Sequence, residues 1–184
     1  MTMRQFYDWQ TAGGSGDVSK LVQALEAREI PWCMIGGLAV KHWAQEPMAT
    51  ADVDLVIAAE RVEEAVAALQ ECGFGAQRFE WSINLKGHSR VSVQISTEDF
   101  YREFPSRAVP ADVHGILMRV ANLEDTLAGK LQAFRDVQRR PSKRQKDLTD
   151  IARLIEAHPA LRTRVPADLL GKIIGEGDGT AGHK

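Results

Sequence analysis

Apolar residues return at two different spacings along the chain, and the spacing separates expected helices from expected strands. Returns every three or four positions predict helices, at residues 17–28, 38–45, 59–72, 123–137, 146–157 and 165–174. Short apolar or alternating runs predict strands, at residues 32–35, 53–57, 77–85, 90–96 and 116–120. Gly87 separates the runs 77–85 and 90–96, so these two runs are expected to form a hairpin.

Residues typical of helix ends and loops flank several of these runs. Gly73 follows the helix expected at 59–72, where glycine can adopt the left-handed conformation that closes a helix. Asn122 is a suitable N-cap for the next long helix, and Pro141 marks a loop after it. The stretch TAGGSG at 11–16 predicts a flexible connection, and the Gly-rich stretch 175–184 predicts a disordered tail.

The order of these elements predicts the fold class. It runs helix, strand, helix, strand, helix and hairpin, and then continues mainly as helices. This order is typical of an α/β (α+β) protein with a small mixed β-sheet and a helical subdomain at its carboxyl end. We therefore expect an α/β core at residues 1–120, a helical subdomain at 121–174 and the tail at 175–184.

Composition narrows the class of protein. The 184 residues are 44% hydrophobic and 26% charged, with a formal net charge of −2, which is ordinary for a soluble globular domain. No apolar run approaches the roughly 20 residues needed to span a membrane, and the stretch MTMRQFYDWQ lacks the apolar core of a secretory signal. These features predict a cytoplasmic protein whose two cysteines are reduced thiols.

Positive charge is concentrated in one segment of this nearly neutral chain. Six basic residues, against one Asp136, occupy the twelve positions from 135 to 146, called the basic segment below: Arg135, Arg139, Arg140, Lys143, Arg144 and Lys146. Such a segment is usually a solvated loop, but it can also form a phosphate-binding surface.

A glycine pair and an acid pair carry the candidate chemistry. Gly36 and Gly37 follow a short buried strand and lead into a helix, so the first amide groups of that helix can face an anion. Asp52 and Asp54 are two residues apart on a strand and therefore project from one face. Two close carboxylates repel unless a cation lies between them, and Mg²⁺ prefers such oxygen ligands. A structural turn and an acid pair that caps a loop remain the alternatives.

Together with the second half of the chain, these residues resemble a known family. The pattern IGGLAV followed by TADVDLVI is similar to the GG-x-A and T-x-D-h-D-h motifs of the polymerase-beta-like nucleotidyltransferase superfamily, where h is hydrophobic. LAGKLQAFR, at 127–135, resembles the K-h-x-A helix of its AbiEii-type and minimal nucleotidyltransferases. RQKDLTDIARL, at 144–154, resembles their R-x-x-D-h-x-D-h motif. The resemblance covers residues 30 to 157.

The resemblance implies transfer of a nucleoside monophosphate from an NTP to an acceptor hydroxyl. It assigns the nucleotide to Gly36, Gly37, Thr50 and Lys130. It assigns Mg²⁺ or Mn²⁺ to Asp52 and Asp54, and it makes Asp147 or Asp150 a further catalytic acid that accepts a proton or orients the acceptor. Catalysis would then involve five residues: Asp52, Asp54, Lys130, Asp147 and Asp150. Without the family context, Lys130 would be an exposed helical lysine and the two acids helix-start charges.

Two departures from the family pattern concern activity. The arginine that often precedes the threonine is replaced by Met48, so phosphate binding is expected from Lys41 or the basic segment. A third carboxylate is common on a later strand, but the corresponding positions here hold Ser92 and Gln94. Glu98, just beyond, would need a shift in strand register to reach the acid pair.

Two functional hypotheses remain open. The first is a toxin-like or defence-like nucleotidyltransferase, with an RNA or tRNA acceptor favoured by the basic segment and an antitoxin-type protein as a possible partner. A small-molecule acceptor would instead favour a cleft rich in acids. The second is a catalytically degenerate member of the fold that binds nucleotides or proteins, which the missing arginine and carboxylate favour.

Overall fold

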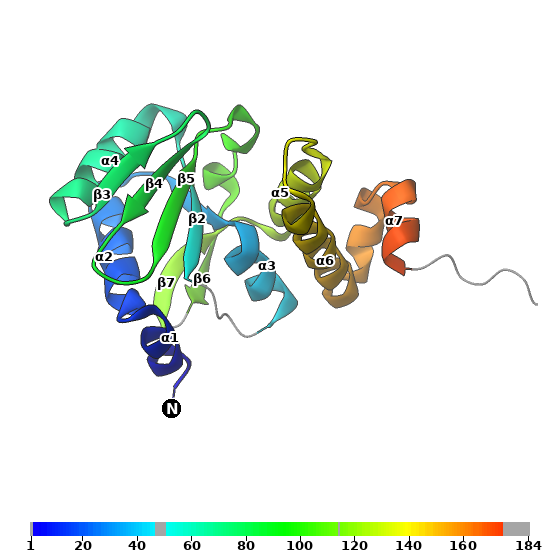
Figure 1. The fold of residues 1–184 in the computed structure, drawn as a ribbon, viewed down its shortest axis with the longest axis horizontal. Coiled ribbons are helices and arrows are strands. Elements are labelled where there is room, and N and C mark those ends of the chain that lie inside the picture. Colours follow the sequence, from blue (N-terminus) through cyan, green and yellow to red (C-terminus); the bar gives the residue numbers. More distant parts are fainter. Residues whose placement is uncertain (1, 47–50, 114, 175–184) are drawn as a thin grey trace, which may run out of the picture.

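A computed structural model describes residues 2–46, 51–113 and 115–174. The predicted tail therefore lies outside the described residues. Seven strands form one mixed sheet in the order β3-β4-β5-β2-β1-β7-β6 (Figure 1). Their bounds are β1 Trp32–Ile35, β2 Asp52–Ile57, β3 Gly75–Arg78, β4 Ser82–Lys86, β5 Ser92–Ser96, β6 Val109–Val113 and β7 Ile116–Val120. The pairs β2–β5 and β1–β7 are parallel and the others antiparallel, so the α/β class with a mixed sheet is confirmed.

Seven α-helices and four short 3₁₀ helices complete the described residues. The α-helices are α1 Met3–Thr11, α2 Gly14–Ala27, α3 Gly36–Ala44, α4 Val62–Glu71, α5 Leu123–Arg135, α6 Pro141–Ala157 and α7 Ala167–Ile174. The 3₁₀ helices are η1 Ala59–Arg61, η2 Asp99–Tyr101, η3 Pro105–Arg107 and η4 Pro159–Arg164. Among the described residues, no helix has both the length and the apolar character that crossing a membrane requires.

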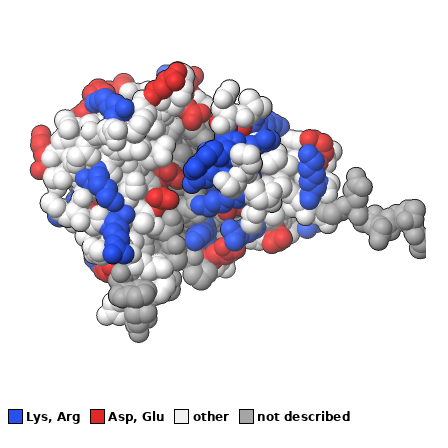
Figure 2. All heavy atoms as spheres, in the orientation of Figure 1, with Lys and Arg blue, Asp and Glu red and all other residues white. Residues whose placement is uncertain are grey.

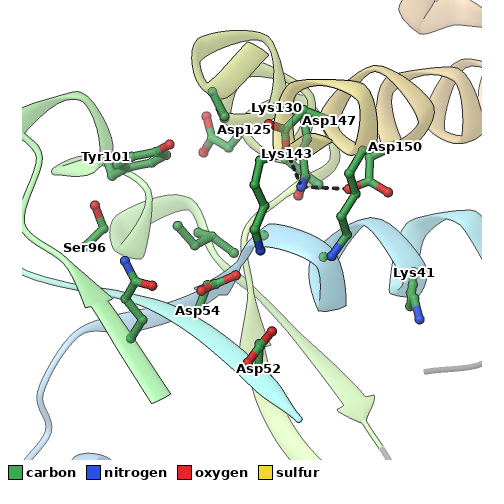
Figure 3. A pocket seen from close by; sticks show the side chains of 18 of the residues that line it. Lys41, Asp52, Asp54, Ser96, Tyr101, Asp125, Lys130, Lys143, Asp147 and Asp150 are labelled. Carbon is green, nitrogen blue, oxygen red and sulfur yellow. Dashed lines mark hydrogen bonds and ion pairs between the residues drawn. The ribbon is translucent and has the colours of Figure 1, made fainter. Parts of the chain in front are cut away.

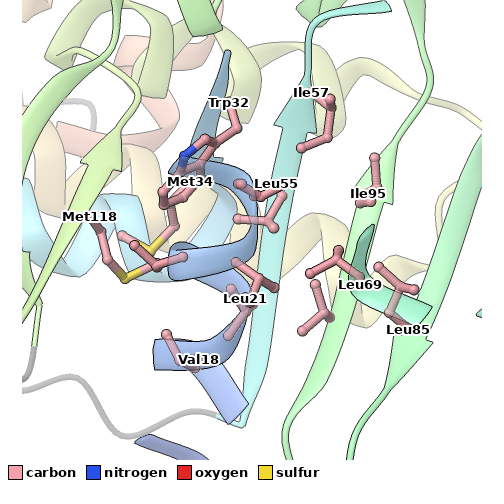
Figure 4. Packing of buried hydrophobic residues seen from close by; sticks show 14 of the residues in the cluster. Val18, Leu21, Trp32, Met34, Leu55, Ile57, Leu69, Leu85, Ile95 and Met118 are labelled. Atoms are coloured by element: carbon pink, nitrogen blue, oxygen red, sulfur yellow. The ribbon is translucent and has the colours of Figure 1, made fainter. Parts of the chain in front are cut away.

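The period-two pattern of the central strands separates an apolar face of the sheet from a polar one. On β2, Val53 and Leu55 are buried on one face, whereas Asp52 and Asp54 project from the other. On the apolar face, side chains from α2 and α4, such as Leu21 and Leu69, pack against the strands (Figure 4). The large core therefore lies on the apolar face of the sheet, and the opposite, polar face of the sheet is left to form a site.

A second apolar cluster lies on the side of the polar face of the sheet and joins α3 to α5 and α6. Fully buried Val40 of α3 packs with Leu127 of α5 and Ile151 of α6. Trp43 of α3 also packs there, and its indole Nε1 donates to the carbonyl of Ala121 at 2.9 Å. These contacts fix α5 and α6 relative to α3, which leads directly out of β1 (Figure 1).

Several element predictions require correction. Residues 77–85 are not one strand: they contain the end of β3, a turn and most of β4, closed where the Phe79 amide donates to the Ser82 carbonyl at 2.8 Å. The turn contains neither glycine nor proline, so the alternation alone hid the reversal. The stretch 11–16 is not a flexible connection, because Gly14 is buried in the first turn of α2. Helix α6 begins at Pro141, where a missing amide proton costs nothing.

Candidate active site

The acid pair lies at the amino end of β2, on the floor of a cleft of about 670 Å³ between the sheet and helices α3, α5 and α6 (Figure 3). Asp52 is exposed and Asp54 half-buried, and both line the cleft. Burial raises the pKa of the Asp54 carboxyl, Lys130 opposes this rise, and Asp52 adds to it. The two acids are thus brought together as predicted, at a place where a cation would relieve their repulsion.

The first glycine of the pair is required by its closeness to Asp54. In the antiparallel pair of β1 and β2, Ile35 lies opposite Asp54, and Gly36 follows with φ of +69°. A Cβ atom at Gly36 would come within 2.2 Å of the Asp54 carboxylate oxygen Oδ2. The sequence Gly36-Gly37 therefore lets α3 begin directly beside the acid pair.

Helix α3 begins beside the acid pair without a side-chain cap. Ile35 is at its N-cap position and supplies no capping hydrogen bond, while both glycines line the cleft. The first amide groups of such a helix are suited to an anion. Thr50, assigned to the nucleotide by the resemblance, and Met48 lie outside the described residues.

Strand β5 lies on the other side of β2, where a third carboxylate was considered. Its register places Ser92 opposite Asp52 and Gln94 opposite Asp54. Glu98 lies four residues beyond Gln94, past the end of β5, and also lines the cleft. No group of three or more His, Cys, Asp or Glu side chains suited to a metal occurs in the described parts of the chain.

Helices α5 and α6 place an ion-pair network across the cleft from the acids. The ammonium of buried Lys130 lies 3.1 Å from Asp147 Oδ1 and 2.7 Å from Asp150 Oδ2 (Figure 3). Arg139 Nε donates to Asp147 Oδ2 at 2.5 Å, and Arg153 Nη1 donates to Asp150 Oδ1 at 3.2 Å. All five side chains line the cleft.

Two members of this network were not singled out by the sequence. Arg153 is one helical turn beyond Asp150 and also reaches Glu46, with its Nε 3.0 Å from Glu46 Oε1. Arg139 belongs to the basic segment, but nothing local indicates that it meets Asp147. The i, i+3 spacing of Asp150 and Arg153 was a usable signal, whereas the contact with Glu46 depends on the tertiary fold.

The arginine of the R-x-x-D motif has a structural contact instead of a place in the cleft. Arg144 Nε donates to the Phe134 carbonyl at 3.0 Å, and its guanidinium lies 5.1 Å from the centre of the Phe134 ring. It therefore ties the start of α6 to the end of α5.

Aromatic side chains form the wall of the cleft beyond β5. Tyr101 and Phe104 are buried, line the cleft and meet edge to face with ring centres 5.2 Å apart. Burial and the charge of Glu98 raise the pKa of the Tyr101 hydroxyl, so it stays protonated at neutral pH. This wall was not predicted, because η2 and η3 follow no apolar periodicity.

The comparisons with known proteins agree with this arrangement. The family described as "Nucleotidyl transferase AbiEii toxin, Type IV TA system" matches residues 20–178, most of the chain. The chain belongs to the AbiEii nucleotidyl transferase family. The resemblance inferred from the motifs is therefore confirmed, while a comparison with curated proteins gave no match.

Solved structures that resemble this AbiEii-family chain are nucleotidyltransferase folds. The antibiotic-resistance factor ANT(2'')-Ia is 16% identical with a TM-score of 0.56, over 81% of this chain and 91% of its own. The lincosamide antibiotic adenylyltransferase LnuA is 12% identical with a TM-score of 0.53, over 77% and 96%. A nucleotidyltransferase-like antigen of Paracoccidioides brasiliensis is 20% identical with a TM-score of 0.53, over 87% and 85%. At these identities the likeness establishes the fold alone.

Proposed function

We propose that this chain is a metal-dependent nucleotidyltransferase that moves a nucleoside monophosphate from an NTP to an acceptor hydroxyl. The observation that carries the proposal is the acid pair Asp52 and Asp54, set beside an uncapped helix start at Gly36 and facing a cation-bearing helix across one cleft. A cleft of about 670 Å³ has the size of a small-molecule site.

The residues present fit Mg²⁺ or Mn²⁺. Asp52 and Asp54 offer carboxylate oxygens from one face of β2, and the raised pKa of Asp54 reflects a burial that a cation would offset. Magnesium commonly binds through one or two carboxylates together with substrate phosphates, so a third acid is not required. When bound, the ion would neutralise negative charge on the phosphates.

In the proposed reaction, the acceptor oxygen bonds to the α-phosphorus of the NTP, and the bond from that phosphorus to the leaving pyrophosphate breaks. The hydroxyl proton passes to solvent water as the new bond forms. Asp147 and Asp150 are buried and bound to cations. We therefore assign them an orienting role, through Lys130 and Arg139, in preference to that of a proton acceptor.

An RNA acceptor, for example tRNA, is the favoured acceptor class. Lysine and arginine side chains gather around the hollow between the sheet and the C-terminal helices (Figure 2). Such clusters attract phosphate backbones. The family description supports a toxin role and an antitoxin-type partner. The seven acidic side chains among the described residues that line the cleft, together with the antibiotic adenylyltransferases of the same fold, keep a small-molecule acceptor as the competing possibility.

A catalytically degenerate binding module is the second candidate. It is favoured by Gln94, which occupies the place opposite Asp54 where a third carboxylate would complete a metal site. In this case the cleft would bind an NTP with its metal but transfer nothing.

One labelling experiment separates these functions. The protein is incubated with Mg²⁺, each α-labelled NTP in turn and total RNA, in parallel with the Asp52→Asn/Asp54→Asn variant. We expect label in RNA from the wild type and none from the variant. Label in a small acceptor alone would refute the RNA preference, and NTP binding without any transfer would favour the binding module. A wild type that binds no NTP would exclude both functions.

A further inference from the structure

The lysine that the family motif assigns to phosphate is already paired. Lys130 is 7% exposed, and its ammonium lies between the carboxylates of Asp147 and Asp150. A buried ammonium in such contacts is held in place by them, because separating the charges would take a cation away from two buried acids and leave each with a single arginine partner. Lys130 can therefore stabilise the cleft wall but has little charge to offer a phosphate.

The whole network around Lys130 is neutral. Three cations, Lys130, Arg139 and Arg153, face three carboxylates: Asp147, Asp150 and Glu46. A triphosphate carries several negative charges, and the acid pair on the floor adds two more of the same sign. A metal ion held by the acid pair would offset only the charges of those two acids, so binding a triphosphate requires further cations outside this network.

Two lysines of the basic segment meet this requirement. Lys143 and Lys146 are exposed residues of α6, one helical turn apart, and both line the cleft. Neither has a carboxylate partner in an ion pair within the described residues. The positive charges of both act on Asp54 and lower its pKa against the effect of burial.

Each of the two lysines lies near one part of the candidate nucleotide site. The Lys146 ammonium lies 3.8 Å from the position that a Cβ atom of Gly37 would occupy. Figure 3 shows Lys143 extending from α6 toward Asp54. Lys41, the other cleft lysine outside the network, lies further along α3 and points away from Asp52 and Asp54 in the same view.

We propose that Lys143 and Lys146 hold the triphosphate of the NTP over Gly36-Gly37, and that Lys130 is a positioning residue for the acids of α6. This assignment rests on the proposed function and names the cations that replace the arginine absent before Asp52. Lys143 and Lys146 thus bind the triphosphate from α6, and the glycine turn binds it from the start of α3.

Inorganic tripolyphosphate with Mg²⁺ tests the assignment independently of the base and the acceptor. Its affinity is measured by isothermal titration calorimetry for the wild type, Lys143→Met, Lys146→Met and the double variant. Each single substitution should weaken binding about tenfold, as expected for the loss of one charge-assisted contact. Lys143→Arg and Lys146→Arg should retain binding because they keep the positive charge. Lys20→Met should also retain binding, because Lys20 is an exposed lysine of α2, which packs on the apolar face of the sheet.

The outcomes separate the two proposals. If the wild type binds tripolyphosphate and NTPs and the double variant binds them equally well, the lysine assignment is wrong while the proposed function stands. If the wild type binds neither ligand, both proposals are wrong. Where transfer is measurable, the Met variants should raise the KM for NTP more than they lower kcat, because the lost contacts exist before the reaction begins.

Discussion

Replacing Gly36 with alanine should damage both the fold and the acid pair. The residue has φ of +69°, a conformation that costs an L-amino acid about 1–2 kcal/mol. The new Cβ would also lie 2.2 Å from Asp54 Oδ2 and 3.0 Å from Asp54 Cβ. Rotation of the carboxylate can relieve the first contact, at about 0.5–1.5 kcal/mol, but the second is with the stem of the side chain and persists.

The two costs together give a loss of roughly 1.5–3.5 kcal/mol in the free energy of unfolding. For a chain of this size, each kcal/mol corresponds to about 2–4 °C, so the Tm should fall by roughly 3–14 °C. Gly37→Ala is the matched control for stability. Its nearest neighbour to a new Cβ is Lys146 Nζ at 3.8 Å, and alanine is favoured over glycine within a helix.

Thermal unfolding followed by circular dichroism, with and without Mg²⁺, measures both consequences. We expect Mg²⁺ to stabilise the wild type but not Gly36→Ala, since the Asp54 carboxylate of the variant is turned away. Gly37→Ala should have a Tm equal to or above that of the wild type. Equal Tm values for the two variants would refute the account of why the first glycine is required.

Three further substitutions test the charge and packing arguments. Lys130→Met should lower the free energy of unfolding in urea by up to about 3–5 kcal/mol, because it leaves buried Asp147 and Asp150 with one arginine partner each. Adding Asp147→Asn should recover part of this loss, and no recovery would contradict the pairing. Asp54→Asn should stabilise the metal-free protein at neutral pH. The raised pKa means that the folded state binds the proton more tightly, so Asp54 costs stability as pH rises above the unfolded value of about 3.9. In urea unfolding measured at a series of pH values, the gain in the free energy of unfolding should vanish below about pH 4. A gain independent of pH would contradict the assignment of this cost to the Asp54 charge. Arg144→Lys should lower the free energy of unfolding by about 1–2 kcal/mol, because lysine replaces neither the stacking on Phe134 nor the planar donor; unchanged urea unfolding would contradict that role.

Local patterns were sufficient for most of the fold. The predicted strand at 32–35 coincides with β1, the prediction at 116–120 coincides with β7, and Asn122 caps α5 with its side chain. Strand β6 was missed because Val109–Val113 contains a proline and an aspartate, residues that oppose a strand assignment. Helix α1 was missed because its stretch of nine residues is too short for the spacing of its apolar residues to decide.

The candidate site was predictable wherever it depended on spacing. Asp52 and Asp54 share a face because they are two apart on a strand. Lys143 and Lys146 share one because they are a helical turn apart on α6, but the helix was expected to begin only at residue 146, so this pair was not predicted. What spacing could not predict is which groups meet across the fold. Lys130 lies 17 residues from Asp147, and only the packing of α5 against α6 turns the expected phosphate ligand into the centre of an ion-pair network.

The distance between the floor acids and the α6 lysines is set mainly by apolar contacts. Helix α3 carries the glycine turn at one end and packs Val40 between α5 and α6 further along. Trp43 then bonds to the Ala121 carbonyl and accepts a contact from His158, whose Nε2 lies 2.7 Å from the Trp43 carbonyl oxygen. Close-packed contacts of this kind allow little movement, whereas exposed lysine side chains remain flexible. The fold thus holds the two walls of the cleft at a fixed separation, so that the proposed binding of a triphosphate would require ordering the side chains of Lys143 and Lys146 without moving a helix.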